Sequence, residues 1–181
     1  MKYLLTNQQT ERLHFRLLQD SDFDEWTKLF YNKDAARFLG MDPSLSPKEL
    51  CQSWFDKSFK RYEDELGGMN VLVDKQSGRL IGQCGLLIQT IQDEQRMEIG
   101  YSILPEFWGQ GFATEAAVKH KNVAFENNYT DSLISVIHPE NIGSEKVALK
   151  NGMQVEKFID DYKGMPVRIF CIKKNDWLSQ A

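Results

Sequence analysis

The stretch EQRMEIGYSILPEFWGQGFATEAA, residues 94–117, decides the fold of this chain. Its first part, residues 97–104, is rich in Ile, Tyr and Met and predicts a largely buried strand. Pro105 cannot donate a hydrogen bond to a sheet, so the strand should end there. Gly109 and Gly111 follow, and the residues after them favour a helix. The pattern therefore predicts a strand, a turn, a glycine-rich loop and a helix in direct succession.

A glycine-rich loop before a helix predicts an anion site, because the first N–H groups of a helix have no acceptor within it. The loop reads WGQGFAT over residues 108–114. It is not a P-loop, since no Lys-Ser/Thr pair follows, and it lacks the third glycine of a dinucleotide-binding loop. A tight turn that binds nothing is the alternative for two glycines taken alone. We interpret the loop as a pyrophosphate site.

Length and composition limit the class of protein. The 181 residues predict a single domain over residues 1–181, large enough to bury a core without disulfides. With 22 basic and 26 acidic residues the net charge is −4, which argues against a nucleic-acid surface. The 3 cysteines are scattered and predict neither disulfides nor a metal site. No segment resembles a signal peptide or a membrane span, so we expect a cytoplasmic protein, either a monomer or a homodimer.

Periodic patterns predict the remaining elements in the order strand, two helices, three strands, helix, strand, helix and two strands. Ser46, Pro47 and Glu49 combine a capping box with proline at the first helical position. Gly82 and Gly85 inside a strand predict a bulge or a close approach of two backbones. The strands are expected at residues 11–18, 69–73, 80–88, 97–104, 133–137, 155–159 and 167–172, and the helices are expected to begin near residues 20, 46, 112 and 141.

Further motifs lie on both sides of the glycine-rich loop: EIGY at residues 98–101, NIGS at residues 141–144 and KNGM at residues 150–153. With the opening TERLHFR, residues 10–16, they make the chain resemble the GNAT superfamily of acyl-CoA-dependent N-acetyltransferases. A tryptophan before the Gly-x-Gly sequence, here Trp108, resembles the pattern of the branch of ribosomal-protein N-terminal acetyltransferases. The general family pattern has Arg or Gln at that position. The resemblance implies an α/β fold: a mixed, mostly antiparallel twisted sheet of about seven strands, helices on both faces and a splayed central parallel pair.

The resemblance also implies acetyl-CoA as co-substrate, held largely by backbone groups. The pantetheine arm would pair with one strand, and the loop amides would bind the pyrophosphate. Asn141 would cap the next helix and reach a pantetheine amide, and Ser144 would lie near the cofactor sulfur. The predicted cofactor-binding residues are Ile103, Leu104, Gly109, Gln110, Gly111, Phe112, Ala113, Thr114, Asn141 and Ser144.

Glu98 is the predicted general base, which would accept the proton of an attacking amine directly or through water. Strand alternation places it on one face with Gly100 and Ser102, whose small size would leave room above that face. The alternative is a structural carboxylate paired with Arg96 or another cation.

Many members of the superfamily carry a Tyr general acid at the position of Ala148 in this chain. Protonation of the leaving thiolate is therefore assigned to Ser144, to water or to no group, since a thiol with a pKa of about 8.5 leaves readily. Cys84 and His120 are interpreted as core residues.

We expect an acetyl-CoA-dependent N-acetyltransferase in which a primary amine attacks directly in a ternary complex. The acceptor is left open between a protein N-terminus, a polyamine, an aminoglycoside-like amine and a free amino acid. A catalytically silent acyl-CoA-binding regulator is the alternative of another class. Acidic groups at residues 63–65, at Glu94 and at residues 160–161 would attract a cationic amine, unless they are merely solvated loop charges.

Overall fold

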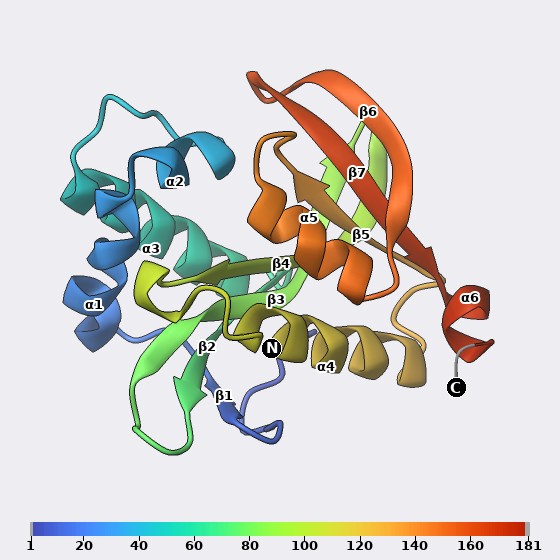
Figure 1. Cartoon of the computed structure of the whole chain (residues 1–181), viewed down its shortest axis with the longest axis horizontal. Coiled ribbons are helices and arrows are strands. Elements are labelled where there is room, and N and C mark those ends of the chain that lie inside the picture. Colours follow the sequence, from blue (N-terminus) through green and yellow to red (C-terminus); the bar gives the residue numbers. More distant parts are fainter. Residues whose placement is uncertain (1, 180–181) are drawn as a thin grey trace.

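The computed structural model describes residues 2–179 and contains one seven-stranded sheet with the order β1-β2-β3-β4-β5-β7-β6 (Figure 1). All neighbouring strands are antiparallel except the central pair β4 and β5, which is parallel. The strands are β1 (Leu13–Arg16), β2 (Gly67–Asp74), β3 (Leu80–Ile91), β4 (Glu94–Ile103), β5 (Ser132–Ile137), β6 (Gln154–Tyr162) and β7 (Met165–Lys173).

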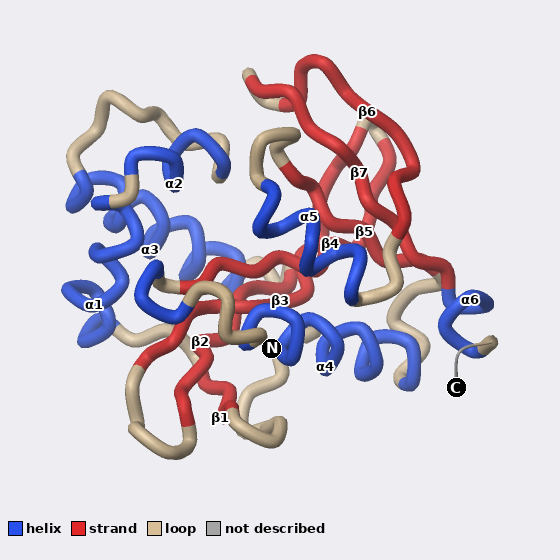
Figure 2. The backbone as a smooth tube through the Cα atoms, in the orientation of Figure 1, coloured by secondary structure: helices blue, strands red, loops and turns tan. Residues whose placement is uncertain are grey.

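Helices cover both faces of the sheet, as predicted. They are α1 (Phe23–Thr27), α2 (Lys33–Phe38), α3 (Pro47–Glu63), α4 (Phe112–Glu126), α5 (Ile142–Lys150) and α6 (Lys174–Leu178). Gln83 of β3 accepts a hydrogen bond from the Trp54 indole of α3, whereas its neighbour Cys84 packs in the core cluster that includes Ala116 of α4. Because adjacent strand residues face opposite ways, α3 and α4 lie on opposite faces. Figure 2 shows α1–α3 grouped together and separate from α4 and α5.

The capping box predicted at the start of α3 is confirmed. Glu49 Oε2 accepts a hydrogen bond from the Ser46 N–H at 2.8 Å, and Ser46 Oγ accepts one from the Glu49 N–H at 3.4 Å. The helix buries Cys51 and Phe55 against α1 and the sheet. This fixed start matters for function because the last turns of α3 reach the centre of the sheet.

The two glycines of β3 allow a close approach of neighbouring strands, as predicted. A Cβ atom at Gly85 would lie 1.8 Å from the Gly68 carbonyl oxygen, and one at Gly82 would lie 2.4 Å from the Ser102 carbonyl oxygen. Any side chain at either position would therefore displace β2 or β4. The close approach holds β4 in the register that carries the site.

The strands β4 and β5 separate soon after they meet. They pair only at Met97 with Leu133 and at Glu98 with Ile134, although β4 continues to Ile103. One residue further on, a side chain replaces the sheet hydrogen bond: Ser135 Oγ donates to the Ile99 carbonyl at 2.8 Å. The splayed parallel pair is thus present and has its point of divergence at Glu98.

The first predicted helix, expected to begin near residue 20, differs most from the observed structure. The segment from residue 20 to residue 38 forms two 3₁₀ turns and two short helices, because Asn32 takes an extended conformation and caps a new helix, α2. The last two strands are longer than predicted and meet in a two-residue turn at Lys163 and Gly164. Helix α6 was not predicted. Within residues 2–179, no helix is both long and apolar enough to cross a bilayer.

Candidate active site

Glu98 lies at the point where β4 and β5 diverge, and neutral groups hold its carboxylate from both sides. Gln89 Nε2 of β3 donates to Oε2 at 2.7 Å, and the Val136 N–H of β5 donates to Oε1 at 3.4 Å. Arg96, the cation expected to pair with Glu98 if that carboxylate were structural, instead pairs with Glu156 at 3.0 Å. The interpretation of Glu98 as the ion-pair partner of Arg96 is therefore wrong. The carboxylate of this β4 residue therefore connects β3 with β5. None of its hydrogen-bond donors in the described chain is a cation.

Burial raises the pKa of Glu98 above the usual range of a glutamate. The hydrogen bonds from Gln89 and Val136 act in the opposite direction, as do the more distant charges of Arg61 and Lys163. A carboxylate with a raised pKa is a better proton acceptor than an exposed one, which suits a general base.

The space above Gly100 is filled, contrary to expectation. A Cβ atom there would lie 2.7 Å from Leu87 Cδ1 and 3.3 Å from Met69 Sδ. Glycine at this position therefore accommodates the packing of β2 and β3. On the β5 side, the strand pairing of β4 ends at Glu98.

The glycine-rich loop has the geometry of an anion cradle. Gly109 and Gly111 have φ angles of +74° and +83°, values that glycine adopts without strain, and Gly111 is the N-cap of α4. Among residues 2–179, the backbone N–H groups of residues 109–114 have no hydrogen-bond acceptor. A Cβ atom at Gly109 would meet nothing within 4 Å. A row of free amides facing open space fits a bound phosphate.

Arg12 brings a cation to this loop, and no local sequence pattern predicts this contact. Its guanidinium donates to the Gln110 carbonyl at 3.0 Å and pairs with Glu115 of α4 at 2.6 Å. It also lies over the Phe112 ring at 4.2 Å. The positive charge that Trp108 does not supply within the motif is therefore present beside the loop, on the residue that precedes β1.

Trp108 itself is about half exposed, at 54%, and its indole donates to the Ile103 carbonyl at 2.6 Å. The Leu104 N–H donates to Ile81 of the neighbouring segment at 3.0 Å, which occupies that amide. Hydrogen bonding alternates along an antiparallel pair, so the backbone of Tyr101 and Ile103 points toward the gap beside β5. Tyr101 was not identified from the sequence as a residue of this gap.

The start of α5 lies across the same gap. Asn141 Oδ1 accepts a hydrogen bond from the Ser144 N–H at 3.1 Å, which confirms the predicted N-cap. The Tyr101 hydroxyl donates to the Ser144 carbonyl at 2.8 Å and so connects β4 with α5. Burial strongly raises the pKa of Tyr101, which keeps the phenol protonated. Two hydroxyl-bearing residues, Tyr101 and Ser144, thus lie close to the diverging strands.

Three other residues belong to the core. Cys84 is fully buried and burial raises the pKa of its thiol, so it is not an activated nucleophile. His120 is also fully buried, and burial lowers its pKa to about 4. Ala148 is buried as well, so the position of the family's tyrosine presents no polar group.

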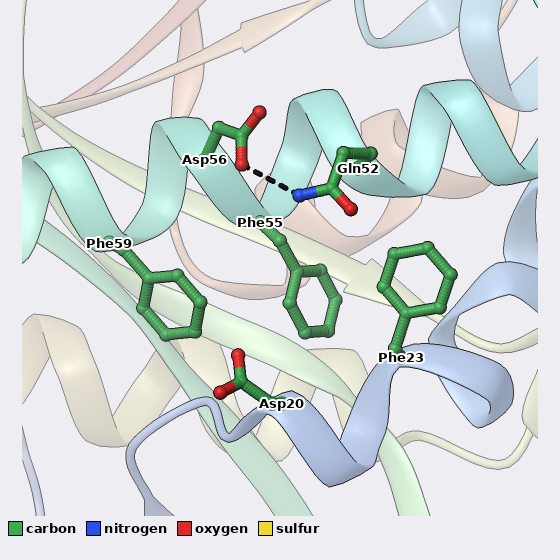
Figure 3. Close-up of a pocket in the computed structure, with 6 residues that line it drawn as sticks. All are labelled: Asp20, Phe23, Gln52, Phe55, Asp56 and Phe59. Atoms are coloured by element: carbon green, nitrogen blue, oxygen red, sulfur yellow. Dashed lines mark hydrogen bonds between the residues drawn. The ribbon is translucent and has the colours of Figure 1, made fainter.

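Two surface hollows lie near these elements. One, of about 490 Å³, borders the loop on the side of Arg12, Gln110 and Phe112. The other, of about 450 Å³, lies between α1 and α3 and is shown in Figure 3. Its lining consists of Asp20, Phe23, Gln52, Phe55, Asp56 and Phe59. None of these is a predicted site residue. Among residues 2–179, no group of three or more His, Cys, Asp or Glu side chains is arranged to hold a metal.

Residues 12–154 match the family described as the acetyltransferase (GNAT) domain, and the chain belongs to this family. It is therefore an N-acetyltransferase that uses acetyl-CoA as its co-substrate. Among curated proteins it is similar to the uncharacterized N-acetyltransferase YoaA of Bacillus subtilis, with 28% identity over 85% of this chain and 86% of that protein.

Solved structures share the fold. The spermidine N-acetyltransferase of Vibrio cholerae, solved with CoA and spermine, superposes with a TM-score of 0.68 at 22% identity, covering 93% of this chain and 99% of that one. The ribosomal-protein-S5-alanine acetyltransferase of Vibrio fischeri superposes with a TM-score of 0.67 at 19% identity, covering 94% and 97%. The mixed sheet with one splayed parallel pair is thus the architecture predicted from the sequence.

Proposed function

We propose that Glu98 is the general base for direct transfer of the acetyl group from acetyl-CoA to a primary amine. The observation that carries this proposal is the position of its carboxylate, held by Gln89 and Val136 at the divergence of β4 and β5. The amine nitrogen forms a bond to the acyl carbon as the carbon–sulfur bond breaks. The proton of the amine passes to Glu98, directly or through one water, and the thiolate of coenzyme A leaves.

Backbone groups hold the co-substrate in this proposal. The free amides of residues 109–114, with Arg12 beside them, bind the pyrophosphate. The backbone N–H groups of Ile103 and Tyr101 pair with the pantetheine arm, and the Asn141 amide reaches one of its amides. The N–H and carbonyl of Leu104 already bond to Ile81 and Phe107 and so do not take part. Ser144 or water donates a proton to the departing thiolate, or the thiolate leaves unprotonated. The Tyr101 hydroxyl is already used on the Ser144 carbonyl.

The acceptor proposed first is the N-terminal amine of a protein, as the resemblance to the ribosomal-protein branch implies. Trp108 before Gly-x-Gly supports this branch, and the Vibrio fischeri neighbour carries such a name. A polyamine is the second candidate, because the Vibrio cholerae neighbour is named a spermidine acetyltransferase. A silent acyl-CoA-binding regulator would bind acetyl-CoA without transfer to any amine.

The substitution Glu98→Gln tests the proposed base. It preserves the shape and most hydrogen bonding of the side chain but removes its basicity, so turnover should fall roughly 10²–10⁴-fold. Calorimetry should give an unchanged affinity for coenzyme A. The deficit should shrink as the pH approaches the pKa of the acceptor amine, where free amine is available without a base.

The matched control is Glu94→Gln, an exposed glutamate on the same strand. It should leave turnover unchanged. Equal kinetics for wild type and Glu98→Gln would remove Glu98 from the mechanism, and loss of cofactor affinity would make its role structural.

A further inference from the structure

Three basic side chains from two different parts of the fold interact electrostatically with Glu98, and one of them, Arg61, is also linked to it by hydrogen bonds through Gln89. Lys57 and Arg61 lie four residues apart on α3 and so share one face of that helix. Arg61 donates to the Ile88 carbonyl of β3 at 3.2 Å, which holds this face over the sheet beside Glu98. The third is Lys163, at the tip of the β6–β7 hairpin. We call these three residues the basic cluster.

The hairpin brings Lys163 across from the far side of the splayed strands. Lys163 and Gly164 have φ angles of +56° and +88°, the geometry of a tight two-residue turn between antiparallel strands. Next to this turn, Met165 lies against Gly40: a Cβ atom at Gly40 would be 3.1 Å from Met165 Cε. The hairpin tip therefore leans onto the segment after α2, on the side of the molecule that carries α3.

A chain of hydrogen bonds connects the basic cluster to the proposed base. Arg61 Nη2 donates to Gln89 Oε1 at 3.3 Å, and Gln89 Nε2 donates to Glu98 Oε2 at 2.7 Å. The charges of Arg61 and Lys163 both act on Glu98, and both also act on Lys57. The cluster and the carboxylate thus belong to one site.

Among the described residues, Glu98 is the one carboxylate whose charge acts on both Lys57 and Arg61, and it forms no direct ion pair with the cluster. Within residues 2–179, Lys57, Arg61 and Lys163 have no ion-pair partner; Arg61 contacts carbonyl and amide oxygens, and Lys163 lies 4.9 Å from the ring of Tyr162. Partial desolvation of the ammonium group, and then the neighbouring cations Arg61 and Lys163, lower the pKa of Lys57, although its side chain is exposed on α3. The hydroxyl of Tyr162 is buried there without a hydrogen-bond partner in the described chain.

Two of the acidic groups expected to attract a cationic amine are engaged within the protein. Asp64 pairs with Lys60 at 2.8 Å, and Asp161 accepts a hydrogen bond from the Gly164 N–H at 2.8 Å. A polyamine would place further positive charges against uncompensated cations. An anionic group would receive charge-assisted hydrogen bonds from the same side chains.

We propose that the acceptor is a primary amine that also carries a carboxylate, with its nitrogen directed to Glu98 and its carboxylate bound by the basic cluster. This inference rests on the proposed function of the same site. The carboxylate is either the α-carboxylate of a free amino acid or an acidic side chain next to a peptide N-terminus. Both sources present the same chemistry to Lys57 and Lys163.

The test compares acceptors that differ only in charge, at saturating acetyl-CoA. Alanine against alaninamide tests the free amino acid, and Ala-Glu-Glu-amide against Ala-Lys-Lys-amide tests the peptide; spermidine represents the polyamines. For at least one pair the anionic member should have kcat/KM about tenfold higher or more. Binding of the same compounds in the presence of coenzyme A is measured in parallel by calorimetry.

Charge reversal at the cluster supplies the matched variants. Lys57→Glu and Lys163→Glu should abolish or invert the preference for the anionic acceptor. Lys60→Glu, on the same helix but paired with Asp64, should leave the preference unchanged. All three side chains are exposed, so the variants should fold.

The two proposals fail in different ways. Acetylation that favours spermidine or Ala-Lys-Lys-amide, or a preference that survives Lys57→Glu and Lys163→Glu, would overturn the carboxylate subsite while leaving the transferase mechanism intact. Cluster-dependent binding of the anionic amines without transfer would support the subsite and overturn the proposed base. Neither binding nor transfer of any anionic amine would overturn both.

Discussion

At the scale of single residues, Glu98 combines a functional position with a cost to stability. Burial raises its pKa, so the folded protein holds the proton at pH values where the unfolded chain has already released it. The free energy of unfolding contributed by this group is therefore highest below the usual glutamate pKa. It falls as the pH rises toward the raised folded value and stays low above it.

Glu98→Gln should consequently stabilise the protein at pH 7. The amide needs no ionisation, but its single oxygen can accept from only one of the two donors, Gln89 Nε2 or the Val136 N–H. The gain should therefore lie at the low end of the roughly 0.5–2 kcal/mol range typical of stabilising substitutions. Guanidinium unfolding at pH 7 and at pH 4 measures it. The gain should shrink at pH 4, where the wild-type carboxyl is largely protonated in both states. A variant less stable than wild type at pH 7 would contradict this interpretation.

The sequence identified Glu98 but not its surroundings. Its strand and its face followed from local alternation, whereas Gln89 and Val136 reach it only through the registers of β3 and β5. Arg12 contacts Gln110, a residue far from it in sequence, and no local pattern marks such a contact. The basic cluster was missed for the same reason, since the β6–β7 hairpin and α3 meet only in the folded chain.

At the scale of elements, local chemistry decided which expectations were accurate. The start of α3 was predicted because Ser46 and Glu49 satisfy each other's backbone within four residues. The helix expected after residue 20 is interrupted by Asn32, whose capping of α2 was overlooked beside the stronger aromatic pattern. The charged residues 160–163 were interpreted as loop, although β6 is an edge strand and tolerates charge along its length.

The loop before α4 yields a prediction with a closely matched control. Gly109→Val should weaken coenzyme A binding at least about 100-fold, since a side chain would obstruct the amides that form charge-assisted bonds to phosphate. Gly78→Val is the control, because Gly78 has a φ of +71°, against +74° at Gly109, and a Cβ atom at either site meets nothing within 4 Å. Both variants carry the same backbone strain, so calorimetry isolates the ligand effect. Equal affinities in the two variants would remove the loop from the phosphate site.

At the scale of the whole molecule, the sheet is two units joined by a short seam. Strands β1–β4 form one unit and β5–β7 the other. The seam includes two residue pairs and the hydrogen bonds of Ser135 with Ile99, Val136 with Glu98 and Tyr101 with Ser144. The proposed site uses both units: Glu98 and the loop lie on the first, and Asn141 and Lys163 lie on the second. A co-substrate held between β4 and β5 would therefore stabilise the contact between them.

Hydrogen exchange with and without coenzyme A tests this coupling. At a ligand concentration of 100 times Kd, the folded state gains about 2.7 kcal/mol, which should raise the unfolding temperature. Amides of residues 109–114 and of Tyr101 and Ile103 should exchange more slowly, because their free N–H groups gain acceptors, and β5 should be protected through the strengthened seam. The end of the β1–β2 pair far from Arg12, at Phe15 and Arg16, serves as the internal reference and should change only through global stability. Protection confined to residues 109–114 would mean that the pyrophosphate binds as proposed but the pantetheine arm does not enter between the two units.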